Sequence, residues 1–169
     1  PTVGQLQRFR ASGGPPGQLQ VVMRPTSPVA EEFRAIRTNL STRIDFDQEA
    51  AALLIASPTG GDGKTTVAAN LAVVFGLAGR SVVLVDADLR NPRQHEIFGT
   101  DNEIGLTTVL NSPTADLDRV VRRTDQPNVS ILPAGPIATR RNPAAVMRRG
   151  PWPWRGRRRP GPRGRPLPG

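Results

Sequence analysis

The residues best suited to chemistry lie in the segment SPTGGDGKTT, Ser57 to Thr66. Three glycines would let the backbone curl tightly and turn its N–H groups inward, as a phosphate cradle requires: Gly60, Gly61 and Gly63. Lys64 could then reach the β- and γ-phosphates of a nucleotide, and the hydroxyl of Thr65 could hold Mg²⁺. The strict pattern has glycine where this chain has Pro58. The segment predicts a phosphate loop that binds a nucleoside triphosphate; the alternative is an ordinary glycine-rich turn.

Two carboxylates follow one helix later, in SVVLVDADLR, Ser81 to Arg90. Val82 to Val85 form an apolar run typical of a short buried strand, and Asp86 and Asp88 come directly after it. Ligands bind at the carboxyl ends of strands in open α/β sheets, so these side chains could hold Mg²⁺ or take a proton from an attacking hydroxyl. Arg90 could pair with them or with phosphate. The other interpretation is a strand end followed by a solvated acidic turn.

The elements that must position these residues are predicted from hydrophobic periodicity. A strand, Ala51 to Ala56, precedes the loop, and an apolar helix, Lys64 to Leu77, follows it and would aim its positive N-terminal end at a bound anion. A right-handed crossover would place this strand parallel to the strand Val82 to Val85. Short helices are expected near 93–98, 106–110 and 115–122, and a strand near 129–132. The predicted fold class is α/β, a parallel sheet flanked by helices that is incomplete on its C-terminal side and, with the glycine-rich loop, resembles the P-loop NTPases of the SIMIBI or Min/Par type.

A further helix is predicted from about Ser27 to Ser41. Ser27 suits the N-cap, and Pro28 suits the first helical position. Three charged residues, each three apart, drift slowly around one face of this helix: Glu31, Arg34 and Arg37. The arginines could meet carboxylates of a neighbouring subunit, or the face could be solvated and hold internal salt bridges.

Taken together, SPTGGDGKTT and VVLVDADLR resemble the deviant Walker A and Walker A′ motifs of bacterial tyrosine kinases (BY-kinases). These are cytoplasmic kinase domains of the CpsD, CapB and Wzc type, which regulate capsule and exopolysaccharide export. The E-x-x-R-x-x-R pattern from Glu31 to Arg37 looks like the family's oligomerisation motif. Three other segments also look like family segments: GLTTVL (Gly105 to Leu110), ILPAGP (Ile131 to Pro136) and NPAA (Asn142 to Ala145). Related Min/Par-type ATPases carry a signature lysine where this chain has Thr59, which argues against that branch.

The resemblance, which covers about Thr26 to Met147, implies an ATP-dependent protein-tyrosine (auto)kinase domain that uses Mg²⁺. Lys64, Asp86 and Asp88 would be catalytic. Thr65 would hold the metal together with the same two carboxylates. The nucleotide would be bound by the loop and one arginine: Gly60, Gly61, Asp62, Gly63, Lys64, Thr65, Thr66 and Arg90. The implied partners are further copies of the chain, joined in a ring through the helix 27–41, and a membrane-bound polysaccharide co-polymerase that acts as activator. The implied location is the cytoplasmic, inner face of the plasma membrane.

Two family features are missing from the sequence. A Walker B strand should follow the NPAA segment, and none does; tyrosine, which these kinases phosphorylate in their own C-terminal tail, is absent. We therefore expect a kinase domain truncated before Walker B, marginally stable and inactive in this form. The alternatives are a non-catalytic nucleotide-binding or interaction module of a polysaccharide co-polymerase complex and, more distantly, a Min/Par-like ATPase.

The C-terminal residues 148–169 are rich in Arg, Pro and Gly and contain no acidic residue. Such a tail cannot bury enough apolar surface to order itself, so we expect it to be disordered. The net charge of +9 belongs to the residues from Arg140 on. Out-of-frame translation of a GC-rich gene is the favoured origin. A nucleic-acid arm with Trp152 and Trp154 as stacking groups, or a membrane-surface segment, are the alternatives, and nucleic acid is not expected as a partner.

The remaining composition agrees with one α/β domain at 26–147, preceded by a flexible linker at 1–25 that is rich in Gly and Pro. Cysteine is absent, which excludes a disulfide framework and a Cys-based metal site. No apolar stretch reaches the length needed to span a bilayer. The single histidine, His95, is expected near the surface or the site rather than as a metal ligand.

Overall fold

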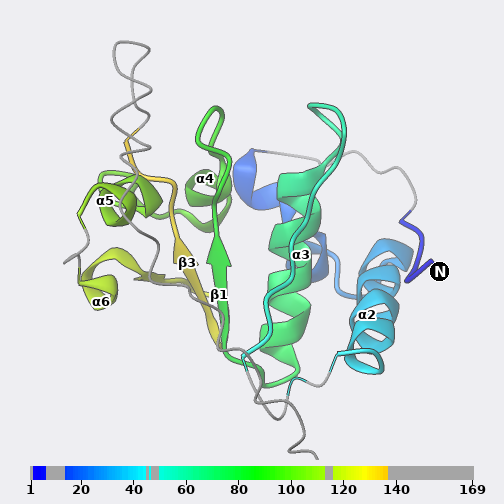
Figure 1. The fold of residues 1–169 in the computed structure, drawn as a ribbon. Helices are drawn as coiled ribbons and strands as arrows, with labels where there is room; N and C mark the ends of the chain where they lie inside the picture. The colour runs from blue at the N-terminus through cyan, green and yellow to red at the C-terminus, as the bar shows by residue number, and fades with distance from the viewer. Residues whose placement is uncertain (1, 7–13, 45, 47–49, 113–115, 137–169) are drawn as a thin grey trace, which may run out of the picture.

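The computed structural model describes residues 2–6, 14–44, 46, 50–112 and 116–136, where the chain forms a small mixed sheet with helices on either side (Figure 1). β1 (Val82–Val85) pairs in parallel with β3 (Val129–Leu132), and β3 pairs antiparallel with β2 (Arg122–Arg123). The described strand order is β1-β3-β2. The predicted α/β class is confirmed, but the described sheet is mixed, not wholly parallel, because the unpredicted β2 runs back against β3.

The helix α3 (Lys64–Leu77) lies between the sheet and α2 (Pro28–Ser41), as Figure 1 shows. Every residue of α3 from Ala69 to Gly76 is buried, as expected for a helix that is apolar all round. α5 (Leu106–Asn111) and α6 (Leu117–Val120) lie on the other side of β3, and α4 (Gln94–Phe98) lies near the carboxyl end of β1. None of the described helices is long and apolar enough to cross a membrane.

The hydrophobic core fills the space between α2, α3 and the sheet. Phe33, Val73 and Ile131 are fully buried there, and Val82 and Leu84 point into the same cluster from β1. Because side chains alternate along a strand, Val83 and Val85 point to the opposite face, where their exposed fractions are 56% and 46%. The predicted buried strand is therefore right only in part: Val82 and Leu84 are partly buried on one face of β1, and the other face is exposed.

Several predicted boundaries agree with the structure. α3, β1 and β3 begin and end at the residues expected from the apolar pattern. Ser27 caps α2 as predicted, since its Oγ accepts a hydrogen bond of 3.2 Å from the amide of Ala30, and Pro28 is the first helical residue. These elements carry local signals, a cap or an uninterrupted apolar run, that do not depend on distant partners.

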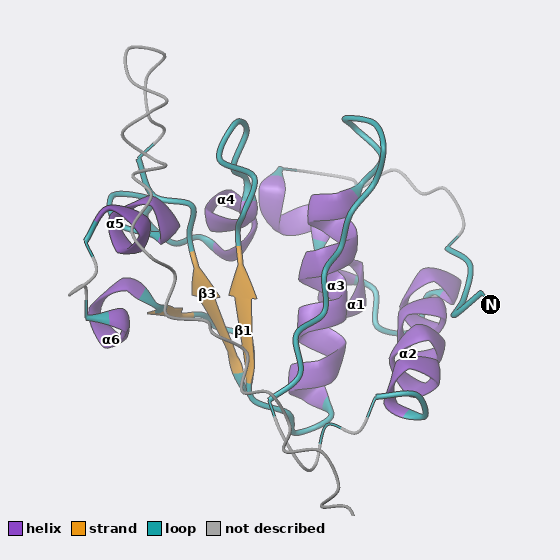
Figure 2. Cartoon of the chain, viewed as in Figure 1, coloured by secondary structure: helices purple, strands orange, loops and turns teal. Residues whose placement is uncertain are grey.

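The strand predicted at Ala51 to Ala56 is absent. These residues have no regular secondary structure and do not join the described sheet; Figure 2 shows the segment as a loop that runs along α3. Leu54 is 84% exposed and Leu53 43% exposed, while Ile55 packs against the core. The apolar run has the composition of a strand, but a strand also needs a neighbouring strand to pair with.

Part of the segment predicted as a linker is folded. A 3-10 turn, η1 (Pro15–Gln18), leads into the short helix α1 (Gln20–Met23), and Leu19 and Val21 are buried in the core cluster. The Gly- and Pro-rich composition led to the linker prediction, although Leu19 and Val21 are apolar residues of the core. The NPAA segment and the tail predicted from residue 148 lie outside the described residues.

Candidate functional site

The predicted phosphate loop joins the N-terminus of α3. Gly61 and Gly63 have φ values of 82° and 85°, in the left-handed region that glycine adopts without strain. Gly63 is the N-cap of α3, and no side chain caps this helix end, so its positive end remains available to an anion. A Cβ placed on Gly60, Gly61 or Gly63 would meet nothing within 4 Å, which shows open space beside the loop.

The side chain of Lys64 folds back into the loop. Its Nζ donates hydrogen bonds of 2.9 Å to Oγ of Ser57 and 2.9 Å to the carbonyl oxygen of Thr59. The loop thus surrounds the ammonium group with oxygen acceptors, which are the kind of partner that phosphate oxygens would replace. Lys64 is also the only lysine in the sequence.

Asp62 shapes the loop. Its Oδ2 accepts hydrogen bonds from the Thr59 hydroxyl (2.6 Å) and the Thr59 amide (3.3 Å). The Thr59 hydroxyl first, and then the Ser57 hydroxyl and the Thr59 amide, hold the pKa of the Asp62 carboxyl below its usual value. Pro58, the departure from the strict loop pattern, is exposed and stands just before this Thr59–Asp62 contact.

The two carboxylates after β1 have different surroundings. Asp86 is 5% exposed; its Oδ1 accepts from the amide of Asp88 (3.2 Å), and its Oδ2 accepts from the amides of Arg93 (3.1 Å) and Gln94 (3.0 Å). Asp86 therefore holds the turn after β1 and the start of α4. Asp88 is exposed, and its Oδ1 accepts from the amides of Arg90 (3.2 Å) and Asn91 (3.0 Å).

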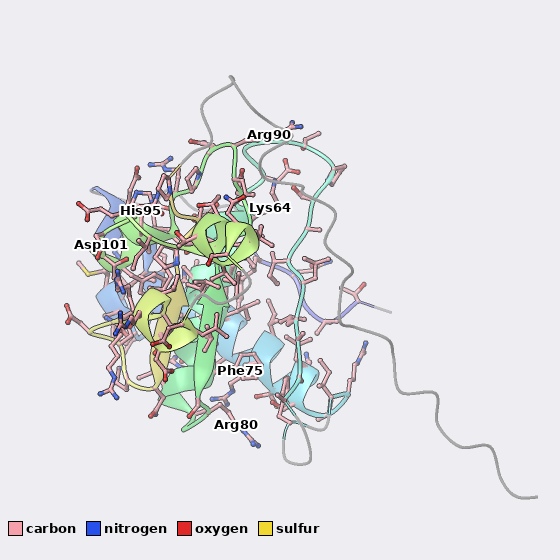
Figure 3. All side chains as sticks on the ribbon, turned by 60° about the vertical axis from the view of Figure 1, so that its left-hand side comes forward. Lys64, Phe75, Arg80, Arg90, His95 and Asp101 are labelled. Carbon is pink, nitrogen blue, oxygen red and sulfur yellow. The ribbon has the colours of Figure 1, made fainter. Side chains whose placement is uncertain are left out.

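One residue that the sequence analysis missed connects the two motifs. Gln94 donates its backbone amide to Asp86, and its Nε2 donates a hydrogen bond of 3.0 Å to the carbonyl oxygen of Thr65. Gln94 therefore bridges the start of α3 and the turn after β1 through these two hydrogen bonds. Figure 3 agrees, because Lys64 and Arg90 lie at the same end of the molecule. The position of Gln94 just after the A′ motif was the only sequence signal for this role.

Other predicted residues lie in or away from this site. The Thr66 hydroxyl donates a hydrogen bond of 2.9 Å to Oε1 of Gln18. His95 follows Gln94 in α4 and is half-buried. Among the described residues, no group of three or more His, Cys, Asp or Glu could hold a metal on its own. Mg²⁺ is commonly bound by one or two carboxylates together with substrate phosphates, and an exposed carboxylate such as Asp88 fits that mode.

The charged residues of α2 are not part of this loop. Arg34 forms an ion pair with Glu31 within the helix and donates to the carbonyl oxygen of Pro25 at 2.8 Å. Arg37 makes a 3.5 Å contact with the hydroxyl of Thr38. The internal salt bridge that the solvated interpretation expected is thus present for Glu31 and Arg34.

The two family-like segments before and after β2 lie side by side. The amide of Leu106 donates to the carbonyl oxygen of Pro133 (2.7 Å), and that of Thr107 to Ala134 (2.9 Å). A Cβ on Gly105 would lie 2.2 Å from the Pro133 oxygen, so only glycine allows this approach.

Comparison with known proteins places the chain among nucleotide-binding domains. The family described as "CobQ/CobB/MinD/ParA nucleotide binding domain" matches residues 53–148. The chain is 39% identical over 123 residues to "Tyrosine-protein kinase YwqD" of Bacillus subtilis (strain 168), covering 73% of this chain and 50% of that protein. It is 35% identical over 129 residues to "Putative tyrosine-protein kinase CapB" of Staphylococcus aureus, covering 76% and 55%.

Solved structures agree. The crystal structure of "the chimerical protein CapA2B2" is 34% identical with a TM-score of 0.69, covering 82% of this chain and 57% of that one. "The kinase domain of Escherichia coli tyrosine kinase ETK" is 28% identical with a TM-score of 0.65, covering 80% and 51%. The resemblance to bacterial tyrosine kinases is confirmed, and the chain spans about half the length of these relatives.

Proposed function

Because the chain belongs to the CobQ/CobB/MinD/ParA nucleotide-binding domain family, we propose that it binds ATP with Mg²⁺ as part of a tyrosine-kinase-type domain. The observation that carries this proposal is the uncapped start of α3 behind Gly61 and Gly63, with the turn after β1 held beside it through Gln94. Relatives named as tyrosine kinases support the choice of reaction over a Min/Par-type activity.

The loop residues would hold the triphosphate. Amides at the start of α3 face the anion, and the hydroxyl of Thr66 adds a donor at the same helix end. Lys64 would leave its contacts with Ser57 and Thr59 and place its ammonium group against the phosphates, where it offsets the charge that develops during phosphoryl transfer. Asp62 holds the loop in this shape through its bond with Thr59, and a Cβ on Gly60 would meet nothing within 4 Å, so this space is open.

The metal would be held by Thr65 and Asp88. Thr65 is at the second position of α3, and Asp88 is the exposed member of the acidic pair. Mg²⁺ bound there supplies charge neutralisation between phosphate oxygens. Asp86 would assist by fixing the turn that carries Asp88 and Arg90. Its remaining lone pairs would contact the outer ligands of the metal. Arg90 would contact phosphate.

The acceptor of the phosphoryl group is a tyrosine outside these 169 residues, since they contain none. The capsule and tyrosine-kinase names of the relatives support a role in capsule or exopolysaccharide production. In that role the domain works at the inner face of the plasma membrane with a membrane-bound polysaccharide co-polymerase, and associates with copies of itself through Glu31, Arg34 and Arg37 on α2. The chain by itself binds nucleotide but transfers little phosphate.

Titration of a fluorescent ATP analogue with Mg²⁺ tests the proposal. Wild type should bind, and Lys64→Ala should bind at least about tenfold more weakly, since a charge-assisted contact is worth about 1.5–3 kcal/mol. Arg43→Ala removes a positive charge just beyond the end of α2 and serves as the control, with affinity unchanged. Equal affinity of wild type and Lys64→Ala would refute the phosphate loop.

A further inference from the structure

The side chain of Thr66 is held by a residue that lies 48 positions earlier in the chain. Its hydroxyl donates to Oε1 of Gln18, the last residue of η1, at 2.9 Å. Thr66 is the third residue of α3, so its hydroxyl lies in the turn that faces a bound anion. The contact joins the N-terminal region directly to the phosphate loop.

Asn70 fixes the same N-terminal residues one turn further along α3. It is fully buried, and its Nδ2 donates to the carbonyl oxygens of Gln18 (2.7 Å) and Thr66 (2.8 Å). Its Oδ1 accepts from the amide of Val21 at 3.1 Å. We call residues 17–21 the N-terminal strap. Two of its side chains, Leu19 and Val21, are buried in the core.

A hydroxyl group has a single proton to donate, and Thr66 donates it to Gln18, so it can donate to a phosphate oxygen only after this bond breaks. We propose that Gln18 competes with the nucleotide for the Thr66 hydroxyl, and that nucleotide binding releases the Gln18 side chain and loosens the strap. This inference rests on the proposed nucleotide binding at the loop. The bond between Gln18 and Thr66 is then a regulatory contact of that site, because it disfavours nucleotide binding.

The strap is well placed to pass this change on. It continues into α1, which packs against both α2 and α3, and α2 carries the Glu31, Arg34 and Arg37 face. Coupling between two sites is reciprocal, so a partner that fixes the strap lowers nucleotide affinity, and nucleotide frees the strap for a partner.

The first test is nucleotide affinity. Gln18→Leu keeps the size of the side chain but removes the acceptor, and should raise affinity for the fluorescent ATP analogue with Mg²⁺ by about two- to tenfold, the range of one net hydrogen bond. Asn39→Ala is the matched control, because it removes a bond of 2.8 Å from Asn39 to the carbonyl oxygen of Val3, which ties other N-terminal residues to α2. Its affinity should equal that of wild type. Unchanged or weaker binding by Gln18→Leu overturns the competition.

The second test follows the Val21 amide by hydrogen exchange, read by NMR on the full chain. This amide is protected by Asn70, and saturating ATP analogue with Mg²⁺ should speed its exchange at least about threefold, because the strap that carries Val21 loses the anchoring bond from Thr66 to Gln18. In Lys64→Ala the same nucleotide concentration should leave Val21 unchanged. Wild-type protein that binds nucleotide while Val21 exchange stays constant refutes the coupling alone. Wild-type protein that binds no nucleotide refutes the proposed function and this inference with it.

Discussion

Asp86 and Asp88 are two residues apart, yet one is buried under three backbone amides and the other is exposed. The difference arises because the chain turns back after β1 and presents the amides of Arg93 and Gln94 to Asp86. The A′ pattern identifies both acids as chemically important, but it cannot distinguish the one that orders the turn from the one that faces solvent.

This contrast predicts different consequences for the two substitutions. Asp86→Asn replaces a charged acceptor with a weaker one, and should lower the free energy of unfolding by about 1–3 kcal/mol. Asp88→Asn should change it by less than about 0.5 kcal/mol, as for most exposed sites, but should reduce the extent to which Mg²⁺ strengthens ATP binding. Urea denaturation and titrations with and without Mg²⁺ measure the two effects. Equal destabilisation by both variants would contradict this division of roles.

At the scale of elements, the close contact between α3 and the turn before β3 depends on Gly76. A Cβ at this position would lie 2.4 Å from the Pro127 carbonyl oxygen and 2.6 Å from Cγ2 of Val129. Asn128 adds a hydrogen bond of 3.1 Å to the Gly76 carbonyl oxygen. α3 can therefore pack this closely against the turn only because Gly76 has no side chain.

We predict that Gly76→Ala lowers the free energy of unfolding by about 1–3 kcal/mol through overpacking, although alanine favours a helix over glycine by about 1 kcal/mol. Gly60→Ala is the matched control, because a Cβ there meets nothing within 4 Å, and its effect should stay within about 0.5 kcal/mol. Urea denaturation of both variants measures the difference. A more stable Gly76→Ala protein would show that the helix does not sit this close.

The face of α2 gives a second prediction at this scale. Arg34 already has Glu31 and the Pro25 carbonyl oxygen as partners, so Arg37 is the better candidate for a bond to another copy of the chain. Arg37→Ala should weaken self-association by about tenfold or more, the value of a charge-assisted hydrogen bond. Sedimentation equilibrium with Mg²⁺ and ATP measures it, with Arg43→Ala as the charge-matched control. Identical association of wild type and Arg37→Ala would assign this face to solvent.

The sequence was a good guide to elements with local signals and a poor guide to those that depend on partners. Ser27 and Pro28 mark the start of α2, and the apolar run of α3 marks its whole length. The segment Ala51 to Ala56 has the right composition for a strand, but pairing is a property of two segments, and only one is visible in a pattern. Gln94 and Gln18 act through single side-chain bonds to distant backbone or hydroxyl groups, which no spacing rule encodes.

Taken as a whole, the chain contains the predicted phosphate loop and the acidic turn but spans about half the length of its kinase relatives. Its sequence has no Walker B strand after residue 145 and no tyrosine. We therefore expect these 169 residues to bind nucleotide without supporting phosphoryl transfer. The loop supplies charge stabilisation, whereas transfer also needs an ordered metal and a bound acceptor.

We predict that phosphate transfer from radiolabelled ATP to an added tyrosine peptide stays at the level of Lys64→Ala, which serves as the background. Because the chain contains no tyrosine, any phosphotyrosine must be on the peptide, and the assay is free of autophosphorylation on tyrosine. Clear transfer above that background would show that a Walker B carboxylate is not required for this chemistry.

Binding of a triphosphate at the start of α3 can be followed on Lys64 itself. It is the only lysine, so an amine-reactive acetylating reagent followed by mass spectrometry reports on this one side chain. We predict that saturating ATP with Mg²⁺ slows acetylation of Lys64 at least about tenfold, as a charge-assisted contact with phosphate would, while adenosine, which lacks phosphates, leaves the rate unchanged. An acetylation rate that is the same with and without ATP and Mg²⁺, or one that adenosine slows equally, would show that no triphosphate binds against Lys64.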